Sequence, residues 1–167
     1  MTRQGETRVY VGLGSNQGDR VSHIRQALSA IASLPGVCAL RSSSVYETRP
    51  MGPQDQPDFL NAVCRFDYTG SAASLLQQLQ SIERGHGRQQ GGPRWGMRPL
   101  DLDILLYGEE LIDTPDLQVP HAGLGMRSFV LWPLAELSPG LHVPGLGSVE
   151  SLRRNCQHFG IRVHEEG

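Results

Sequence analysis

The sequence predicts an α+β fold in which a single domain occupies residues 1–167. Two observations support this prediction. Segments rich in β-forming residues and segments whose apolar residues recur at helical spacing follow one another in the order β-α-β-β-α-β. Stretches rich in glycine and proline separate these segments, and neither an internal repeat nor a domain boundary is seen.

The first half of the chain predicts one helix between strands. Residues 8–13 form a β-rich run that glycines end, and the turn that follows leads into a helix that ends at Pro35 and Gly36. The apolar residues at helical spacing are Val21, Ile24, Leu28 and Ile31. Residues 37–46 are extended in character, whereas residues 47–57 carry three prolines and a glycine and therefore predict a long loop.

The second half begins with the same pattern. Residues 59–68 predict another strand, and Ser71 is a candidate N-cap for a second helix. The apolar stripe of this helix consists of Leu75, Leu76, Leu79 and Ile82. Residues 85–96 hold five glycines and form a second long loop, after which residues 100–107 are the clearest strand of the chain.

The C-terminal part extends this core. A short hairpin is expected after Gly108, then a helix around residues 127–137, and a short helix near residues 149–157. Strands and helices in this order are typical of a ferredoxin-like α/β sandwich with a mainly antiparallel sheet, here with C-terminal additions.

The composition excludes several classes of function. The net charge is -2, so no bulk attraction to nucleic acid or to a membrane surface is expected. All 15 basic residues are arginine, which excludes a P-loop lysine, a Schiff-base lysine and a lysine general base. Cys38, Cys64 and Cys156 are widely spaced and predict a reduced, cytoplasmic chain without a disulfide framework or a zinc site. The sequence predicts neither a signal peptide nor a membrane span.

Asp101 and Asp103 are the first candidates for chemistry. Side chains of a strand alternate between its faces, so both carboxylates point one way while Leu100, Leu102 and Ile104 point the other. Two neighbouring carboxylates suit one or two Mg²⁺ ions, which are usually bound together with waters and substrate phosphates. The alternative is an edge-strand pair that forms salt bridges with arginines.

Arginines and a flat-ring pocket extend this hypothesis. The arginines just upstream are Arg84, Arg88, Arg94 and Arg98, most of them in the glycine-rich loop. Positive charges near a carboxylate pair are typical of a phosphate clamp built around a metal. Trp95 could stack on a flat heterocycle, or pack on the core. Asn61 could bind the edge of a pterin or purine, or hydrogen-bond the backbone instead.

Standard nucleotide motifs are missing. In the segment GLGSNQG, Gln17 stands where the dinucleotide fingerprint requires its last glycine, and no P-loop motif occurs. His121 and Arg127 flank the start of a predicted helix and could donate hydrogen bonds to an anion, or could simply be solvated at the surface.

Four segments together resemble the 6-hydroxymethyl-7,8-dihydropterin pyrophosphokinases. They are GLGSNQGDR at residues 12–20, GPQDQPDFLNAV at 52–63, RWGMRPLDLDILLYG at 94–108 and VPHAGLGMRSFVLWPLAEL at 119–137. Their order and spacing match as well, so the resemblance covers nearly the whole chain. It implies a ferredoxin-like fold and a Mg²⁺-dependent transfer of the β,γ-diphosphate of ATP to the pterin, with release of AMP, in folate biosynthesis.

The resemblance also implies roles for individual residues. Asp101 and Asp103 match carboxylates that hold two Mg²⁺ ions on the triphosphate, and Arg88 and Arg98 match arginines that stabilise the transferring phosphates. The positions that match the ATP site are Gln80, Glu83, Arg88, Trp95, Arg98, Ile104, His121 and Arg127. The positions that match the pterin pocket are Thr48, Met51, Phe59, Asn61, Trp95, Asp101 and Phe129. A monomer is expected.

Four positions depart from the family pattern: Gln90, Met97, Pro99 and Ala122. Gln90 stands where a second loop arginine is common. Other readings of the chain are a non-catalytic nucleotide- or RNA-binding ferredoxin-like module, an inactive relative that binds without turnover, and a different Mg²⁺-dependent phosphotransferase that would release ADP.

Overall fold

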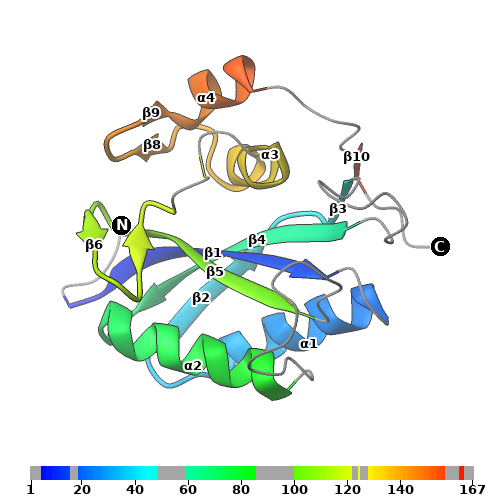
Figure 1. Cartoon of the computed structure of the whole chain (residues 1–167), viewed down its shortest axis with the longest axis vertical. Coiled ribbons are helices and arrows are strands. Elements are labelled where there is room, and N and C mark those ends of the chain that lie inside the picture. The colour runs from blue at the N-terminus through cyan, green and yellow to red at the C-terminus, as the bar shows by residue number, and fades with distance from the viewer. Residues whose placement is uncertain are drawn as a thin grey trace.

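The computed structural model describes residues 5–15, 19–48, 59–85, 100–121, 124, 128–156 and 162–163. In this part of the chain a six-stranded sheet forms the middle layer (Figure 1). β1 (Thr7–Ser15) lies between β4 (Phe59–Tyr68) and β5 (Asp101–Tyr107). β2 (Val37–Ser42) and β3 (Tyr46–Thr48) both pair with β4, and β10 (Arg162–Val163) pairs with β3. These pairings are antiparallel, which confirms the predicted α+β architecture.

Two helices, α1 (Arg20–Ala32) and α2 (Ala72–Gly85), cover one face of the sheet (Figure 1). The Asp19 side chain caps α1 by accepting a hydrogen bond from the backbone N–H of Ser22 at 3.1 Å. The predicted cap of α2 is confirmed, because Ser71 Oγ accepts from the backbone N–H of Ser74 at 3.1 Å. Gly36 follows α1 at a φ of +85°, a conformation that favours glycine.

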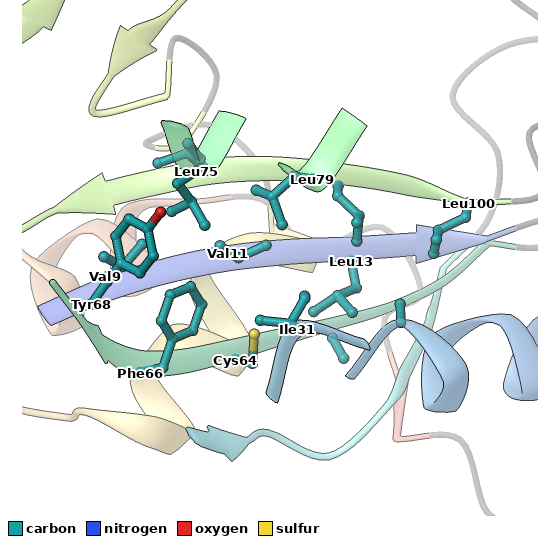
Figure 2. Packing of buried hydrophobic residues seen from close by; sticks show 14 of the residues in the cluster. Val9, Val11, Leu13, Ile31, Cys64, Phe66, Tyr68, Leu75, Leu79 and Leu100 are labelled. Atoms are coloured by element: carbon teal, nitrogen blue, oxygen red, sulfur yellow. The ribbon is translucent and has the colours of Figure 1, made fainter. Parts of the chain in front are cut away.

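The main core lies between the sheet and these two helices (Figure 2). The sheet contributes alternate residues of its strands, as period-two burial requires. The residues at its centre include Val9, Val11, Leu13, Cys64, Phe66 and Tyr68 from the sheet and Ile24, Ile31, Leu75 and Leu79 from the helices. The apolar stripes predicted from helical spacing are therefore confirmed as core-facing, with Leu28, Leu76 and Ile82 partly buried at its margin.

The opposite face of the sheet carries the C-terminal additions (Figure 1). They consist of α3 (Ser128–Leu137), the hairpin of β8 (His142–Val143) and β9 (Gly147–Ser148), and α4 (Val149–Asn155). A second hydrophobic cluster joins them to the sheet at Tyr10, Val63, Leu105 and Leu106. The predicted short hairpin after Gly108 is confirmed as β6 (Ile112–Asp113) and β7 (Gln118–Val119).

Several boundaries differ from the prediction. Residues 47–48 were expected in a loop, but both belong to β3, where Glu47 pairs with Leu60 and Thr48 with Phe59. The extended stretch 37–46 is two strands, because Ser43–Val45 leave the ladder between β2 and β3. β8, β9 and β10 were not predicted, since two-residue strands carry no periodic signal. Among the described helices, none combines the length and the apolar character that a membrane span needs.

Candidate active site

Two glycines of β1 lie at the centre of the candidate site. Gly14 pairs with Asn61 of β4 on one side and with Asp101 of β5 on the other, and Gly12 pairs with Asp103. Directly paired residues of antiparallel strands carry their side chains on the same face. Asn61, Asp101 and Asp103 therefore share the face opposite α1 and α2. Because Gly14 has no side chain, only backbone lies between the Asn61 amide and Asp101, whereas the Leu105 side chain packs over Gly12, 3.5 Å from where its Cβ would lie.

Gly14 also approaches Asn61 closely. A Cβ built on Gly14 would lie 3.0 Å from Asn61 Oδ1, a contact that only a shift of the amide could relieve. The Asn61 side chain is itself confined, since the residue is only 7% exposed. A buried planar amide with donors and an acceptor at a fixed position can hydrogen-bond the edge of a flat heterocycle.

The predicted alternation along β5 is confirmed. Leu102 and Ile104 are buried in the core against the helices, whereas Asp101 and Asp103 are half-exposed on the other face. The two carboxylates are two residues apart on one strand, so their Cα atoms are about 7 Å apart. Half-exposed carboxylates at this spacing fit the oxygen ligands that Mg²⁺ requires, with room left for waters and phosphates.

His121 comes close to this carboxylate pair. Its Nε2 lies 3.9 Å from Asp103 Oδ1, and both side chains are partly accessible. The position is fixed by the backbone, because the N–H of His121 donates to the carbonyl of Leu105 at 3.0 Å. A ring nitrogen here can donate a hydrogen bond to an anion that the carboxylates hold through a metal.

Glu83 lies on the other side of β5. It is 5% exposed at the end of α2, and its Oε2 accepts a hydrogen bond from the backbone N–H of Leu102 at 2.7 Å. Leu102 stands between Asp101 and Asp103, so Glu83 holds the segment that carries both carboxylates. Sequence reasoning had placed Glu83 only on the ATP site.

The remaining predicted residues are placed as follows. Phe59 is half-buried at the start of β4 and pairs with Thr48 of β3, next to Asn61. Gln80 is exposed on α2. Ile104 is 2% exposed in the main core, so its side chain lies on the opposite face from the carboxylates. Phe129 lies in the first turn of α3. The predicted residues outside the described ranges are Met51, Arg88, Trp95, Arg98 and Arg127.

Sequence reasoning missed the roles of the glycines and of Tyr46. Gly12 and Gly14 were weighed only as a nucleotide fingerprint, yet two glycines at alternate positions of one strand were the available signal that other groups approach this face closely, as Leu105 and Asn61 do. Tyr46 pairs with Asn61, so it continues the row of paired residues from Asp101 and Gly14 across the sheet. No local pattern indicated it.

A separate group of potential metal ligands lies at the other end of β1. It consists of Glu6, Cys38 and Asp67. The Cys38 thiol donates to Glu6 Oε2 at 3.0 Å, and Arg8 Nε donates to Asp67 Oδ1 at 2.8 Å. Arg8 balances the charge of Asp67, and the pairing of these two residues places the group at the end of β1 opposite Gly14.

Comparison with known proteins decides the family. The model of the 7,8-dihydro-6-hydroxymethylpterin-pyrophosphokinase (HPPK) family matches residues 10–139. The chain belongs to the HPPK family. It is 45% identical over 154 residues to the 2-amino-4-hydroxy-6-hydroxymethyldihydropteridine pyrophosphokinase of Pseudomonas aeruginosa, covering 92% of this chain and 94% of that protein. It is 44% identical to the enzyme of the same name from Haemophilus influenzae, covering 93% and 97% of the two chains.

Solved structures confirm the fold. A wild-type HPPK-DHPS of Plasmodium falciparum with pteroate superposes with a TM-score of 0.70 at 13% identity. The match covers 89% of this chain and 42% of that longer protein. HPPK domains have the ferredoxin-like α/β fold, so the fold predicted from the order of strands and helices is confirmed.

Proposed function

We propose that the chain transfers the β,γ-diphosphate of ATP to the hydroxymethyl group of 6-hydroxymethyl-7,8-dihydropterin, releasing AMP and supplying folate biosynthesis. The observation that carries this proposal is the row of Asn61, Gly14 and Asp101 on one face of the sheet, in a chain of the HPPK family. The row sets a confined amide beside the Asp101 carboxylate, with only the backbone of Gly14 between them. A flat ring and a metal-bound phosphate chain can be held next to each other on such a surface.

The pterin half of the site is proposed around Asn61. Its amide would bind the polar edge of the ring, and its burial excludes water from that hydrogen bond. Phe59 at the same end of β4 offers an aromatic face, and Thr48 lies directly opposite it. We place Met51, Trp95 and Phe129 in the same pocket on the strength of the family resemblance.

The nucleotide half is proposed along β5. Asp101 and Asp103 would hold two Mg²⁺ ions, which would neutralise charge on the triphosphate. His121 would donate to a phosphate oxygen, and Glu83 would keep the carboxylates in place through Leu102. We assign the remaining ATP contacts to Gln80, Ile104 and Arg127 by resemblance, with Ile104 contributing through its backbone because its side chain faces the core.

Chemistry in this arrangement would depend on position and charge. The hydroxymethyl oxygen, held near Asp101, would attack the β-phosphorus in line, and AMP would leave. Arg88 and Arg98 would stabilise charge on the transferring phosphates. No strong general base is required, because a well-aligned phosphoryl acceptor reacts largely through positioning and electrostatics. We expect the enzyme to act in the cytoplasm, as a monomer with one domain.

A product assay tests the proposal. The protein is incubated with ATP, Mg²⁺ and 6-hydroxymethyl-7,8-dihydropterin, and the nucleotides are separated. AMP that appears only with the pterin, without ADP, is the expected result. ADP would indicate an ordinary γ-phosphoryl kinase and would overturn the proposal.

The non-catalytic alternative is not favoured. An RNA-binding sheet of this fold would present aromatic side chains and basic charge on its open face. Here the aromatic side chains Tyr10 and Tyr46 on the described part of that face are buried, and the half-exposed groups beside Gly14 are the carboxylates of Asp101 and Asp103.

A further inference from the structure

Glu136 joins the last turn of α3 to the connection between β2 and β3. Its Oε1 accepts a hydrogen bond from the Tyr46 hydroxyl at 2.7 Å. Its Oε2 accepts from the backbone N–H of Ser44 at 2.9 Å and from Ser44 Oγ at 3.0 Å. One carboxylate therefore takes three donors from a three-residue segment that lies about ninety residues earlier in the sequence.

Tyr46 is the neighbour of Asn61 in the sheet. The two residues are paired across β3 and β4, which brings their Cβ atoms within about 5 Å on the same face. Tyr46 is 8% exposed, and burial together with the hydrogen bond to Glu136 raises the pKa of its phenol. Arg153 of α4 opposes this rise through its charge, so Glu136 and Arg153 are the charged groups that act on Tyr46. The phenol stays protonated and remains a donor to Glu136 at neutral pH.

The segment that Glu136 holds leads directly into the proposed pterin pocket. Ser43 fixes its other side, because its backbone N–H donates to the carbonyl of Val63 at 2.8 Å and its Oγ accepts from the N–H of Val63 at 3.0 Å. Two residues after Tyr46 comes Thr48, which pairs with Phe59. The placement of β3 beside Asn61 therefore depends on β4 from within the sheet and on Glu136 from α3.

The helix α3 does not depend on Glu136 for its own position. Arg65 Nη1 donates to Ser138 Oγ at 2.9 Å and to the carbonyl of Leu137 at 3.3 Å. The hydroxyls of Tyr10 and Ser138 share a further hydrogen bond at 2.7 Å. These contacts anchor the end of α3 on β1 and β4, and Phe129 lies at the start of the same helix. Loss of the Glu136 carboxylate should free β3 from α3 without detaching α3 from the sheet.

We propose that Glu136 is a positioning residue for the pterin substrate: it fixes β3, and with it Tyr46 and the pocket wall at Thr48, relative to Asn61 and to the helix that carries Phe129. This inference rests on the proposed function. It assigns to the C-terminal part of the fold a role in binding one of the two substrates. The nucleotide half of the site, along β5, is independent of Glu136.

The test is a comparison of ligand affinities in Glu136→Gln. Glutamine keeps the size of the side chain but replaces one acceptor oxygen by a donor, so it cannot accept from Ser44 and Tyr46 together. We expect the Kd of the pterin to rise about 5- to 20-fold, because hydrogen bonds to charged groups are among the stronger ones. The Kd of a non-hydrolysable ATP analogue should change by less than about twofold, since distant sites are independent. At saturating pterin, kcat should recover most of its wild-type value.

Tyr46→Phe provides a second variant that does not touch the carboxylate. It should raise the pterin Kd in the same direction, and the double variant should cost less than the sum of the two single changes. Tyr68→Phe is the matched control, because it removes a hydrogen-bonded hydroxyl from the opposite face of β4. Glu109→Gln, in the exposed turn after β5, controls for the charge change.

The measured affinities of Glu136→Gln decide whether Glu136 positions the pterin site. A Glu136→Gln enzyme that binds the pterin like wild type would overturn it, as would one that binds both substrates more weakly by the same factor. Failure of the wild-type enzyme to form AMP would instead overturn the proposed function, and the affinities of the variants would still decide the role of Glu136.

Discussion

Replacing Glu83 by alanine should both destabilise the fold and slow turnover. Glu83 Oε2 accepts the backbone N–H of Leu102 at 2.7 Å, and the glutamate is 5% exposed. Alanine would leave the N–H of Leu102 without this acceptor in a buried position. Because Leu102 separates Asp101 from Asp103, the backbone that presents both carboxylates would also lose a support.

The size of the effect follows from the hydrogen bond. A buried donor that loses its partner costs about 1–3 kcal/mol. For a chain of this length a loss of that size lowers the melting temperature by about 2–12 °C. The value of kcat is expected to fall even at temperatures where the variant remains folded, because misplacing a reacting group by about 1 Å can cost on the order of a hundredfold in rate. Glu83→Gln keeps a carbonyl acceptor and should retain most of the stability.

The measurement is thermal unfolding followed by circular dichroism, together with kcat at saturating substrates. Gln77→Ala is the control, because Gln77 is exposed on the same helix and its loss should change stability by less than about 0.5 kcal/mol. If Glu83→Ala melted within a degree of the Gln77→Ala protein, the hydrogen bond to Leu102 would not be supporting the strand, and the reasoning would be refuted.

Three further predictions concern the core and the site. Gly14→Ala should raise the pterin KM about tenfold and leave the KM for ATP nearly unchanged, because the new Cβ would lie 3.0 Å from Asn61 Oδ1 and overpacking of this kind costs about 1–3 kcal/mol. Steady-state kinetics with each substrate varied in turn checks this prediction. An equal rise of both KM values would contradict it. Removal of Mg²⁺ by a chelator should lower kcat at least about a hundredfold. Asp103→Asn should raise the Mg²⁺ concentration needed to restore activity, and an unchanged Mg²⁺ requirement in this variant would count against Asp103 as a metal ligand. Burial raises the pKa of the Cys64 thiol from 9.0 to about 12, so the folded chain keeps a proton that the unfolded chain releases, and the free energy of unfolding should fall by about 1.4 kcal/mol per pH unit across that window. Urea titrations at several pH values should show that the free energy of unfolding falls less steeply with pH in Cys64→Ala than in the exposed control Cys38→Ala. Parallel pH profiles for the two variants would refute a raised pKa for Cys64.

The parts of the fold that the sequence predicts are those whose pattern depends on residues close together in the chain. The alternation along β5 placed Asp101 and Asp103 on one face, because the period of a strand depends only on neighbouring residues. The helices were found from apolar spacing, and the cap at Ser71 was found because a serine before an apolar run satisfies orphan N–H groups.

The parts that sequence reasoning missed depend on distant partners. Tyr46 and Glu136 lie about ninety residues apart, and nothing near either residue indicates their hydrogen bond. The break at Ser43–Val45 follows from the bonds of Ser43 to Val63 and of Ser44 to Glu136, which replace ladder pairing. The two glycines became informative only when the register set Gly14 between Asn61 and Asp101.

The central claim is that diphosphate transfer takes place on the sheet face bounded by Asn61, Asp101 and Asp103. Its most direct test is pterin-dependent AMP formation, measured side by side for the wild-type protein and for Asp101→Asn and Asp103→Asn proteins with unchanged circular dichroism. The account predicts AMP, without ADP, from the wild type and a loss of at least about a hundredfold in both variants. Near-normal AMP formation by either variant, or ADP from the wild type, would contradict it.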